Sequence, residues 1–118
     1  MNHRIERVNA ELQRVVADII RNRVKNPNLT GMVSVVGVDT AKDLKTAKVI
    51  VSIYGSAEAV EKSFEALKNS AGFIRHELST DLKDFRVMPQ LTFVLDKSME
   101  YSEKINTILE DIKQHDDH

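Results

Sequence analysis

The spacing of apolar residues in this chain changes after Gly31. From Ile5 to Ile20 they recur every three or four residues, which is the period of an amphipathic helix. From residue 33 to residue 54 they alternate or cluster as β-branched residues, which is typical of strands. Helical spacing returns after Ser56. Helical and strand patterns segregated in this way predict an α+β fold.

The ends of the elements carry their own signals. Asn26-Pro27-Asn28 ends the first helix, because the residue before a proline is disfavoured in the α conformation. Ser56 is the expected N-cap of the second helix, and Pro89 belongs at the start of the last strand, where no ladder donor is needed. The expected elements are a helix over 4–25, strands over 33–38 and 47–54, a helix from Ser56 to near Thr80, a strand over 90–95, and a final helix that is capped by Asp96 or Ser98 and carries Tyr101, Ile105, Ile108, Leu109 and Ile112.

The middle helix keeps one apolar face through a glycine. Its apolar residues have a 4-3-4-3-4 spacing: Val60, Phe64, Leu67, Ala71, Ile74 and Leu78. Gly72 lies within this run, and a glycine inside a helix costs about 1 kcal/mol relative to alanine. Two explanations for a glycine at this position remain open. Gly72 marks a kink or the close approach of another backbone, or it is simply tolerated.

Length and composition limit the class of protein. The chain has 118 residues, 42% of them apolar, and no cysteine, so disulfides and a thiol nucleophile are excluded. We expect one domain over residues 1–113, with helices on one face of a three-stranded sheet, and a disordered polar tail over 114–118. No apolar run approaches the roughly 20 residues of a membrane span, and Met1-Asn2-His3-Arg4 does not resemble a signal peptide. The expectation is a cytoplasmic monomer without contact to a membrane.

Charge is distributed unevenly along the chain. The net charge is −1, but residues 1–55 carry nine Lys/Arg against five Asp/Glu, and residues 91–118 carry three Lys against seven Asp/Glu. Such a gradient orients a protein on a polyanion with its acidic end turned away. It is equally compatible with an ordinary solvated surface.

Four arginines of the first helix share its polar face. A heptad drifts by only about 20° around a helix, so residues spaced by seven stay on one side. This arginine ridge consists of Arg7, Arg14 and Arg21, which are spaced by seven, and of Arg4, which lies nearby. Glu11 lies within one helical turn of Arg7 and Arg14, and Asp18 within one turn of Arg14 and Arg21. The ridge is therefore either a phosphate-binding surface or a set of helix-stabilising ion pairs.

No motif for catalysis or cofactor binding is present. The chain lacks a phosphate-binding G-x-x-x-x-G-K-[ST] loop and a dinucleotide-binding G-x-G-x-x-G, and none of its serines has the context of a nucleophile. His115 and His118 flank two aspartates, but a terminal cluster of this kind is a weak metal site. We therefore expect no enzyme, no metal and no cofactor.

The expected order of elements resembles that of a type II KH domain. KH domains clamp about four nucleotides with a G-x-x-G loop between two helices. The equivalent residues here are Asn69-Ser70-Ala71-Gly72, so only the second glycine is present. This departure is similar to the bacterial ribosome-binding factor A family, in which a kink with an Ala-x-Gly pattern replaces the loop. Ser70 stands where that family has alanine.

The resemblance covers nearly the whole chain and depends on the order and spacing of several short pieces. They are Arg4-Ile5-Glu6-Arg7-Val8, Asn26-Pro27 with Leu29-Thr30-Gly31, Asp43-Leu44 with Ala47-Lys48-Val49, Ser52-Ile53-Tyr54-Gly55, Ala71-Gly72-Phe73-Ile74-Arg75, Arg86-Val87-Met88-Pro89 with Leu91-Thr92-Phe93, and Asp96-Lys97-Ser98.

The resemblance implies a ribosome biogenesis factor. Such a factor binds the free small (30S) ribosomal subunit and 16S rRNA, assists late maturation and 5′-end processing, and is associated with growth in the cold. RNA would be held by the arginine ridge, by two loop lysines and by residues around the kink. The candidate RNA-binding residues are Arg4, Arg7, Arg14, Arg21, Lys42, Lys45, Lys68, Asn69, Ser70, Ala71, Gly72, Arg75 and Arg86.

Aromatic side chains that could stack on bases are few. Phe64 and Phe93 have the spacing of core residues, which leaves Tyr54, Phe73 and Phe85. Recognition is therefore expected to depend on RNA shape and phosphates more than on base identity. Two alternatives remain: a protein-binding adaptor without RNA contact, and a small enzyme, for which a cluster of carboxylates with shifted pKa values would be the sign.

Overall fold

The computed structural model describes residues 3–85 and 88–96. These residues form, in chain order, α1 (His3–Asn22), β1 (Met32–Thr40), β2 (Thr46–Tyr54), α2 (Ala57–Asn69), α3 (Ala71–Asp81) and β3 (Gln90–Leu95). The predicted α-β-β-α-(kink)-α-β order of an α+β, type II KH-like domain is confirmed. The expected C-terminal helix and the polar tail over 114–118 lie outside the described residues.

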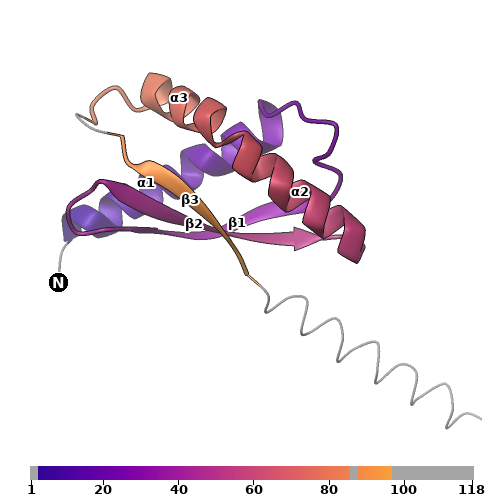
Figure 1. Ribbon diagram of the computed structural model, residues 1–118. Coiled ribbons are helices and arrows are strands. Elements are labelled where there is room, and N and C mark those ends of the chain that lie inside the picture. Colours follow the sequence, from indigo (N-terminus) through magenta and orange to yellow (C-terminus); the bar gives the residue numbers. More distant parts are fainter. Residues whose placement is uncertain (1–2, 86–87, 97–118) are drawn as a thin grey trace, which may run out of the picture.

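The three strands form one mixed sheet in the order β1-β2-β3. β1 and β2 are antiparallel, whereas β2 and β3 are parallel. A parallel pair needs a crossover, and α2 and α3 supply it. All three helices lie on one face of the sheet, as the sequence predicts (Figure 1). The opposite face carries none of the described helices.

Strand β1 is longer than predicted and contains a bulge. Val35 pairs with Val51 and Gly37 pairs with Ile50, so Val36 is an extra residue on the β1 side. The side-chain amide of Gln13 in α1 donates to the carbonyl oxygens of Val35 and Val36 at 3.3 and 3.4 Å. The bulge therefore turns carbonyls of this edge strand toward α1, which satisfies them.

The core lies between the helices and the sheet. Large side chains with no exposed surface come from every helix and from the central strand, because each presents its apolar positions to the same layer. The fully buried large residues are Leu12, Val16 and Ile19 of α1, Leu67 of α2, Ile74 and Leu78 of α3, and Val49 and Val51 of β2. Phe93 of β3 is also buried, as predicted, and Phe64 is only partly buried at the rim of the core.

The connection that enters β1 is fixed to α2 through Gly31. Its backbone N–H donates to the buried Oγ of Ser63 at 2.8 Å. A Cβ at position 31 would lie 2.8 Å from Cγ2 of Ile53 and 3.1 Å from the carbonyl oxygen of Tyr54. Glycine is required here because a larger residue would push this connection away from the sheet.

Candidate nucleic-acid interface

The arginine ridge lies on the solvent side of α1. Arg4, Arg7, Arg14 and Arg21 are all exposed, whereas Leu12, Val15, Val16, Ile19 and Ile20 on the opposite side of the helix are buried. The helix begins at His3 and has a strongly amphipathic pattern. The prediction that these arginines face away from the core is confirmed.

The ion pairs along the ridge differ from those that the sequence allowed. Arg14 pairs with Glu11 at 2.9 Å, but Asp18 pairs with neither Arg14 nor Arg21. Asp18 instead accepts from the side chains of Asn22 at 2.7 Å and Arg23 at 3.1 Å, both nearer the end of α1. Arg7 and Arg21 have no ion pair with any residue that the structure describes. Part of the ridge thus remains available to an external anion.

Arg23 is an important residue that the sequence reasoning missed. The first helix was expected to continue to Lys25, but α1 ends at Asn22, and the N–H groups of Arg23 and Val24 both donate to the carbonyl of Ile19. The Arg23 guanidinium then reaches α3, with atoms 2.7 Å from Asp81 and 3.5 Å from Glu77. Asp81 is 58 residues away in the chain. No local spacing rule could have found this pair.

The pairing of Arg23 with Asp81 affects the protonation of both groups. The hydrogen bond from Arg23 is the largest cause that lowers the pKa of the Asp81 carboxyl, and the bond to Asp81 raises the pKa of the Arg23 guanidinium. Both side chains are about one-third exposed, so solvent weakens the interaction. The main structural effect is to fix the end of α1 against the end of α3.

We expect Asp81→Asn to reduce the acid sensitivity of folding. A carboxyl whose pKa is lowered in the folded state adds stability above its unfolded pKa, and that stability is lost as the pH falls through the folded pKa. Wild-type stability should therefore decrease below about pH 4. The variant should be less stable at pH 7 and should lose less stability on acidification. Urea unfolding at pH 7, 4 and 3 measures this.

Asp84→Asn is the matched control for this experiment. Asp84 is exposed and has no ion pair among the described residues, so its replacement should leave the acid dependence of wild type in place. Equal pH slopes for wild type and Asp81→Asn would contradict a native-state bond between Arg23 and Asp81.

The loop between β1 and β2 presents the two candidate lysines. Lys42 and Lys45 are exposed and lie in a connection that begins after Thr40, whose N–H donates to Oδ1 of Asn9 in α1 at 2.9 Å. Leu44 has a φ of 63°, a left-handed conformation that is unfavourable for a leucine. The bond from Thr40 to Asn9 places the start of this loop beside the N-terminal half of α1. The sequence did not reveal this proximity.

The predicted kink lies at Ser70, between α2 and α3. Ser70 has φ −93° and ψ 2°, and its N–H donates to the carbonyls of both Ala66 and Leu67 at 3.0 and 3.1 Å. The carbonyl of Ser70 accepts from the N–H of Ile74, so the helical ladder resumes after the break. The two helices follow one another with a change of direction at this point (Figure 1). The kink therefore persists with serine in place of the family's alanine.

Gly72 is exposed in the first turn of α3. Apart from its chain neighbours and the backbone of its own helix, a Cβ placed on it would meet no described atom within 4 Å. Within the described chain, close approach of another backbone is therefore not the reason for glycine at this position. The space beside the kink is open to an external ligand. Asn69 is exposed at the same break, and Lys68 is partly engaged, 2.9 Å from Glu65 and 5.3 Å from the centre of the Phe64 ring.

Arg75 has a structural contact that the sequence did not indicate. Its guanidinium donates to the carbonyl of Met88 at 2.9 Å and to that of Pro89 at 3.4 Å. It thereby attaches α3 to the segment that enters β3. Its remaining donors are available to a phosphate, because the residue is exposed. Arg86, the last candidate, lies outside the described residues.

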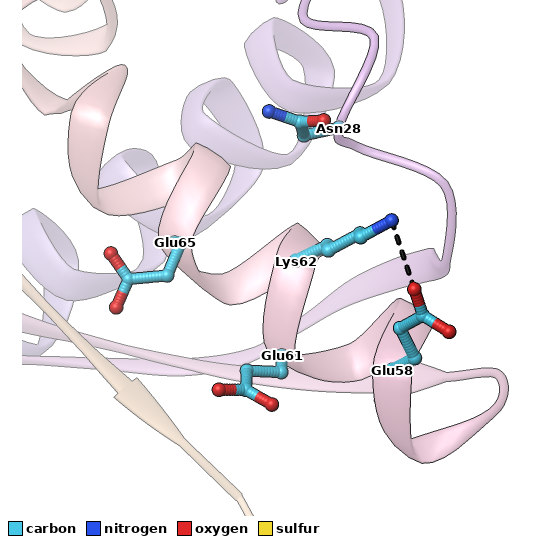
Figure 2. Close-up of a pocket in the computed structure, with 5 residues that line it drawn as sticks. All are labelled: Asn28, Glu58, Glu61, Lys62 and Glu65. Carbon is cyan, nitrogen blue, oxygen red and sulfur yellow. Dashed lines mark ion pairs between the residues drawn. The ribbon is translucent and has the colours of Figure 1, made fainter.

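A shallow groove on α2 has the opposite charge. It is lined by Asn28, Glu58, Glu61, Lys62 and Glu65, and the ammonium of Lys62 lies 3.0 Å from Glu58. Figure 2 shows the carboxylates projecting from the outer side of this helix. Three carboxylates against one ammonium would repel a phosphate backbone. The basic side chains of the described surface therefore lie at the ridge, the β1–β2 loop and the kink, whereas the surface of α2 around this groove is acidic.

The described residues were also searched for metal-ligand clusters and for membrane-spanning helices. No group of three metal-ligating side chains occurs among residues 3–85 and 88–96. Over the same ranges, no helix has the length and apolar character that crossing a membrane requires.

The fold occurs in solved proteins. The crystal structure of ribosome-binding factor A from Thermus thermophilus matches with a TM-score of 0.66 and 23% identity, covering 77% of this chain and 94% of that one. A solution structure of a Thermotoga maritima candidate for the same factor matches with a TM-score of 0.67 and 27% identity, covering 83% and 93%. A Thermus thermophilus model fitted into a cryo-EM map of a 30S complex of that factor matches with a TM-score of 0.62 and 24% identity, covering 75% and 91%.

Two bacterial proteins that are related in sequence share the same name. Ribosome-binding factor A of Clostridium kluyveri is 43% identical over 117 residues, covering 99% of this chain and 96% of the relative. That of Caldanaerobacter subterraneus is 41% identical over 114 residues, covering 97% and 93%. The family model for ribosome-binding factor A matches residues 4–109. Agreement in fold, in sequence and over nearly the full length shows that the chain belongs to the ribosome-binding factor A family.

Proposed function

We propose that this protein binds the small ribosomal subunit through 16S rRNA and assists its late maturation, including 5′-end processing, as a cytoplasmic, monomeric binding protein without catalytic activity. The observation that carries the proposal is the match of residues 4–109 to a family named for ribosome binding. A relative of the same fold has been placed in a 30S complex, which makes the small subunit the candidate partner here.

The charges of the described surface support contact with RNA phosphates. The bond between Asn9 and Thr40 holds the start of the loop with the two lysines beside the N-terminal half of α1, which carries Arg4 and Arg7 of the arginine ridge. The kink offers open space beside Gly72. Of the three aromatic candidates, Tyr54 and Phe73 are exposed and Phe85 is half-buried. Few exposed aromatics favour recognition by shape and phosphates over base stacking.

Charge reversal on the ridge tests this surface. We expect Arg7→Glu with Arg21→Glu to weaken cosedimentation with purified small subunits, because two cations without an ion pair in the described structure would no longer meet phosphates. The slope of log Kd against log salt concentration should decrease by about one for each phosphate that the protein no longer neutralises. Folding should change little, since surface substitutions usually shift stability by no more than about 0.5 kcal/mol.

The matched control is Lys62→Glu, compared with Arg7→Glu alone. Both substitutions change the net charge equally, but Lys62 lies in the acidic groove of α2. We expect the control to bind almost as wild type does. Equal loss in both variants would mean that net charge alone, and not the ridge, determines binding. Binding that is insensitive to salt would favour the protein-binding adaptor.

A further inference from the structure

The turn between β1 and β2 contains a leucine in an unfavourable backbone conformation. Leu44 has a φ of 63°, which lies in the left-handed region. Among residues 3–85 and 88–96, it is the only residue other than glycine with a positive φ. A leucine is rare in this region, because its Cβ comes close to the following carbonyl oxygen. Glycine or asparagine would adopt the same conformation at a lower cost in free energy.

The hydrogen bonds of the turn do not explain why this residue is a leucine. The N–H of Leu44 donates to the carbonyl of Ala41 at 2.9 Å, and the N–H of Ala41 donates to the carbonyl of Thr46 at 2.9 Å. The N–H of Lys45 donates to Oδ1 of Asp43 at 3.0 Å. None of these bonds involves the leucine side chain, so a glycine or an asparagine at position 44 would preserve all of them.

Packing against the core does not explain the leucine either. The partly buried apolar side chains that pack against the core include Val35 of β1 and Leu91 of β3. Leu44 is also half-buried, but within the described part of the chain it is not one of the residues in contact with the core. Backbone strain of this kind is concentrated at sites where a residue contacts a ligand or a partner. The leucine side chain is therefore expected to have its contact outside this domain.

We propose that Leu44 is an RNA-contact residue that packs against an exposed base, while Lys42 and Lys45 on either side of it meet phosphates. Both lysines are exposed, and neither has an ion pair among the residues that the structure describes. An apolar side chain between two cations matches a nucleotide strand, because each nucleotide joins a flat base to a charged phosphate. Leucine is one of the apolar side chains that wedge between bases in nucleic-acid complexes.

Cosedimentation of variants with purified small subunits tests this contact. Leu44→Asn suits the left-handed conformation but lacks the apolar side chain, and we expect it to weaken binding about tenfold or more. Leu44→Met keeps an apolar side chain of similar volume and should restore most of the affinity. Val36→Asn changes an exposed apolar residue of β1 outside the turn and should bind as wild type does. Wild-type affinity of Leu44→Asn, or an equal loss in Val36→Asn, would overturn the proposal.

Two further measurements separate a direct contact from effects on folding and on the lysines. The midpoint of thermal unfolding should be no lower in Leu44→Asn than in wild type, because asparagine adopts the left-handed conformation more easily. A midpoint lower by several degrees would mean that the leucine is kept for packing within the domain, which contradicts the proposal. The slope of log Kd against log salt concentration should be unchanged in Leu44→Asn, whereas Lys45→Ala should reduce it by about one. A reduced slope in Leu44→Asn would show that the leucine only places the lysines, and the direct contact would be refuted.

A photoreactive side chain identifies what position 44 touches. A diazirine amino acid at this position should crosslink to 16S rRNA when the complex with the small subunit is irradiated. Crosslinks to ribosomal proteins alone would assign the leucine to a protein contact and refute the RNA contact. The inference rests on the proposed function, but the two fail differently. A wild-type protein that does not cosediment would refute the proposed function, whereas lost binding in Arg7→Glu with Arg21→Glu and retained binding in Leu44→Asn would refute only the role of Leu44.

Discussion

Leu67→Ala is expected to lower the free energy of unfolding by about 2–5 kcal/mol, because it removes a side chain with no exposed surface from the last turn of α2 and leaves a cavity. That is a large share of the roughly 5–15 kcal/mol that stabilises a small domain. The midpoint of thermal unfolding should decrease by roughly 10 °C or more. Urea and thermal unfolding followed by circular dichroism measure both quantities.

Two substitutions on the same helix calibrate this result. Phe64→Ala should cost less than the roughly 3–5 kcal/mol typical of a buried phenylalanine, because Phe64 lies at the rim of the core. Glu61→Ala, on the exposed side, should change stability by no more than about 0.5 kcal/mol. If Leu67→Ala unfolded at the wild-type midpoint, α2 would have a different register on the sheet.

Gly72→Asp is expected to abolish cosedimentation with small subunits at moderate salt while the protein remains folded. A side chain at this position enters open space, and a carboxylate in the first turn of a helix is favoured by the helix dipole. Bulk and negative charge would then occupy the place beside the kink where we propose that an RNA phosphate approaches. Retained binding by this variant would exclude the kink from the RNA interface.

Two further substitutions at Gly72 separate the causes. Gly72→Asn adds almost the same bulk without charge, so binding by this variant and not by Gly72→Asp would identify repulsion from phosphate as the cause. Gly72→Ala should raise stability by up to about 1 kcal/mol, since the methyl group meets no neighbour and alanine favours a helix. More stable protein with weaker binding would show that glycine is kept for the ligand. Unchanged binding would mean that it is merely tolerated.

Some structural contacts of candidate RNA residues could not be predicted from spacing. Arg75 was identified as a phosphate contact, but its guanidinium also binds carbonyls 13 and 14 residues further along the chain. Asp18 was one possible partner of Arg14 and Arg21 along the ridge, but it pairs with Arg23, which lies just after the end of α1. Local rules predict neighbours within a regular helix, whereas these contacts depend on where α1 ends and on the segment that passes beside α3.

The kink beside Gly72 followed only from the family resemblance, because the apolar spacing runs through that glycine unbroken. The sequence by itself determined the order of the elements, the exposed side of α1 and the N-cap at Ser56. These features depend on local periodicity and local hydrogen bonding, such as that from the Ala59 N–H to the Ser56 Oγ. Only the tertiary structure decided the parallel pairing of β2 with β3, the bulge at Val36 and the bond between Arg23 and Asp81. Each of these joins residues far apart in the chain, and their proximity is set by how the layers pack.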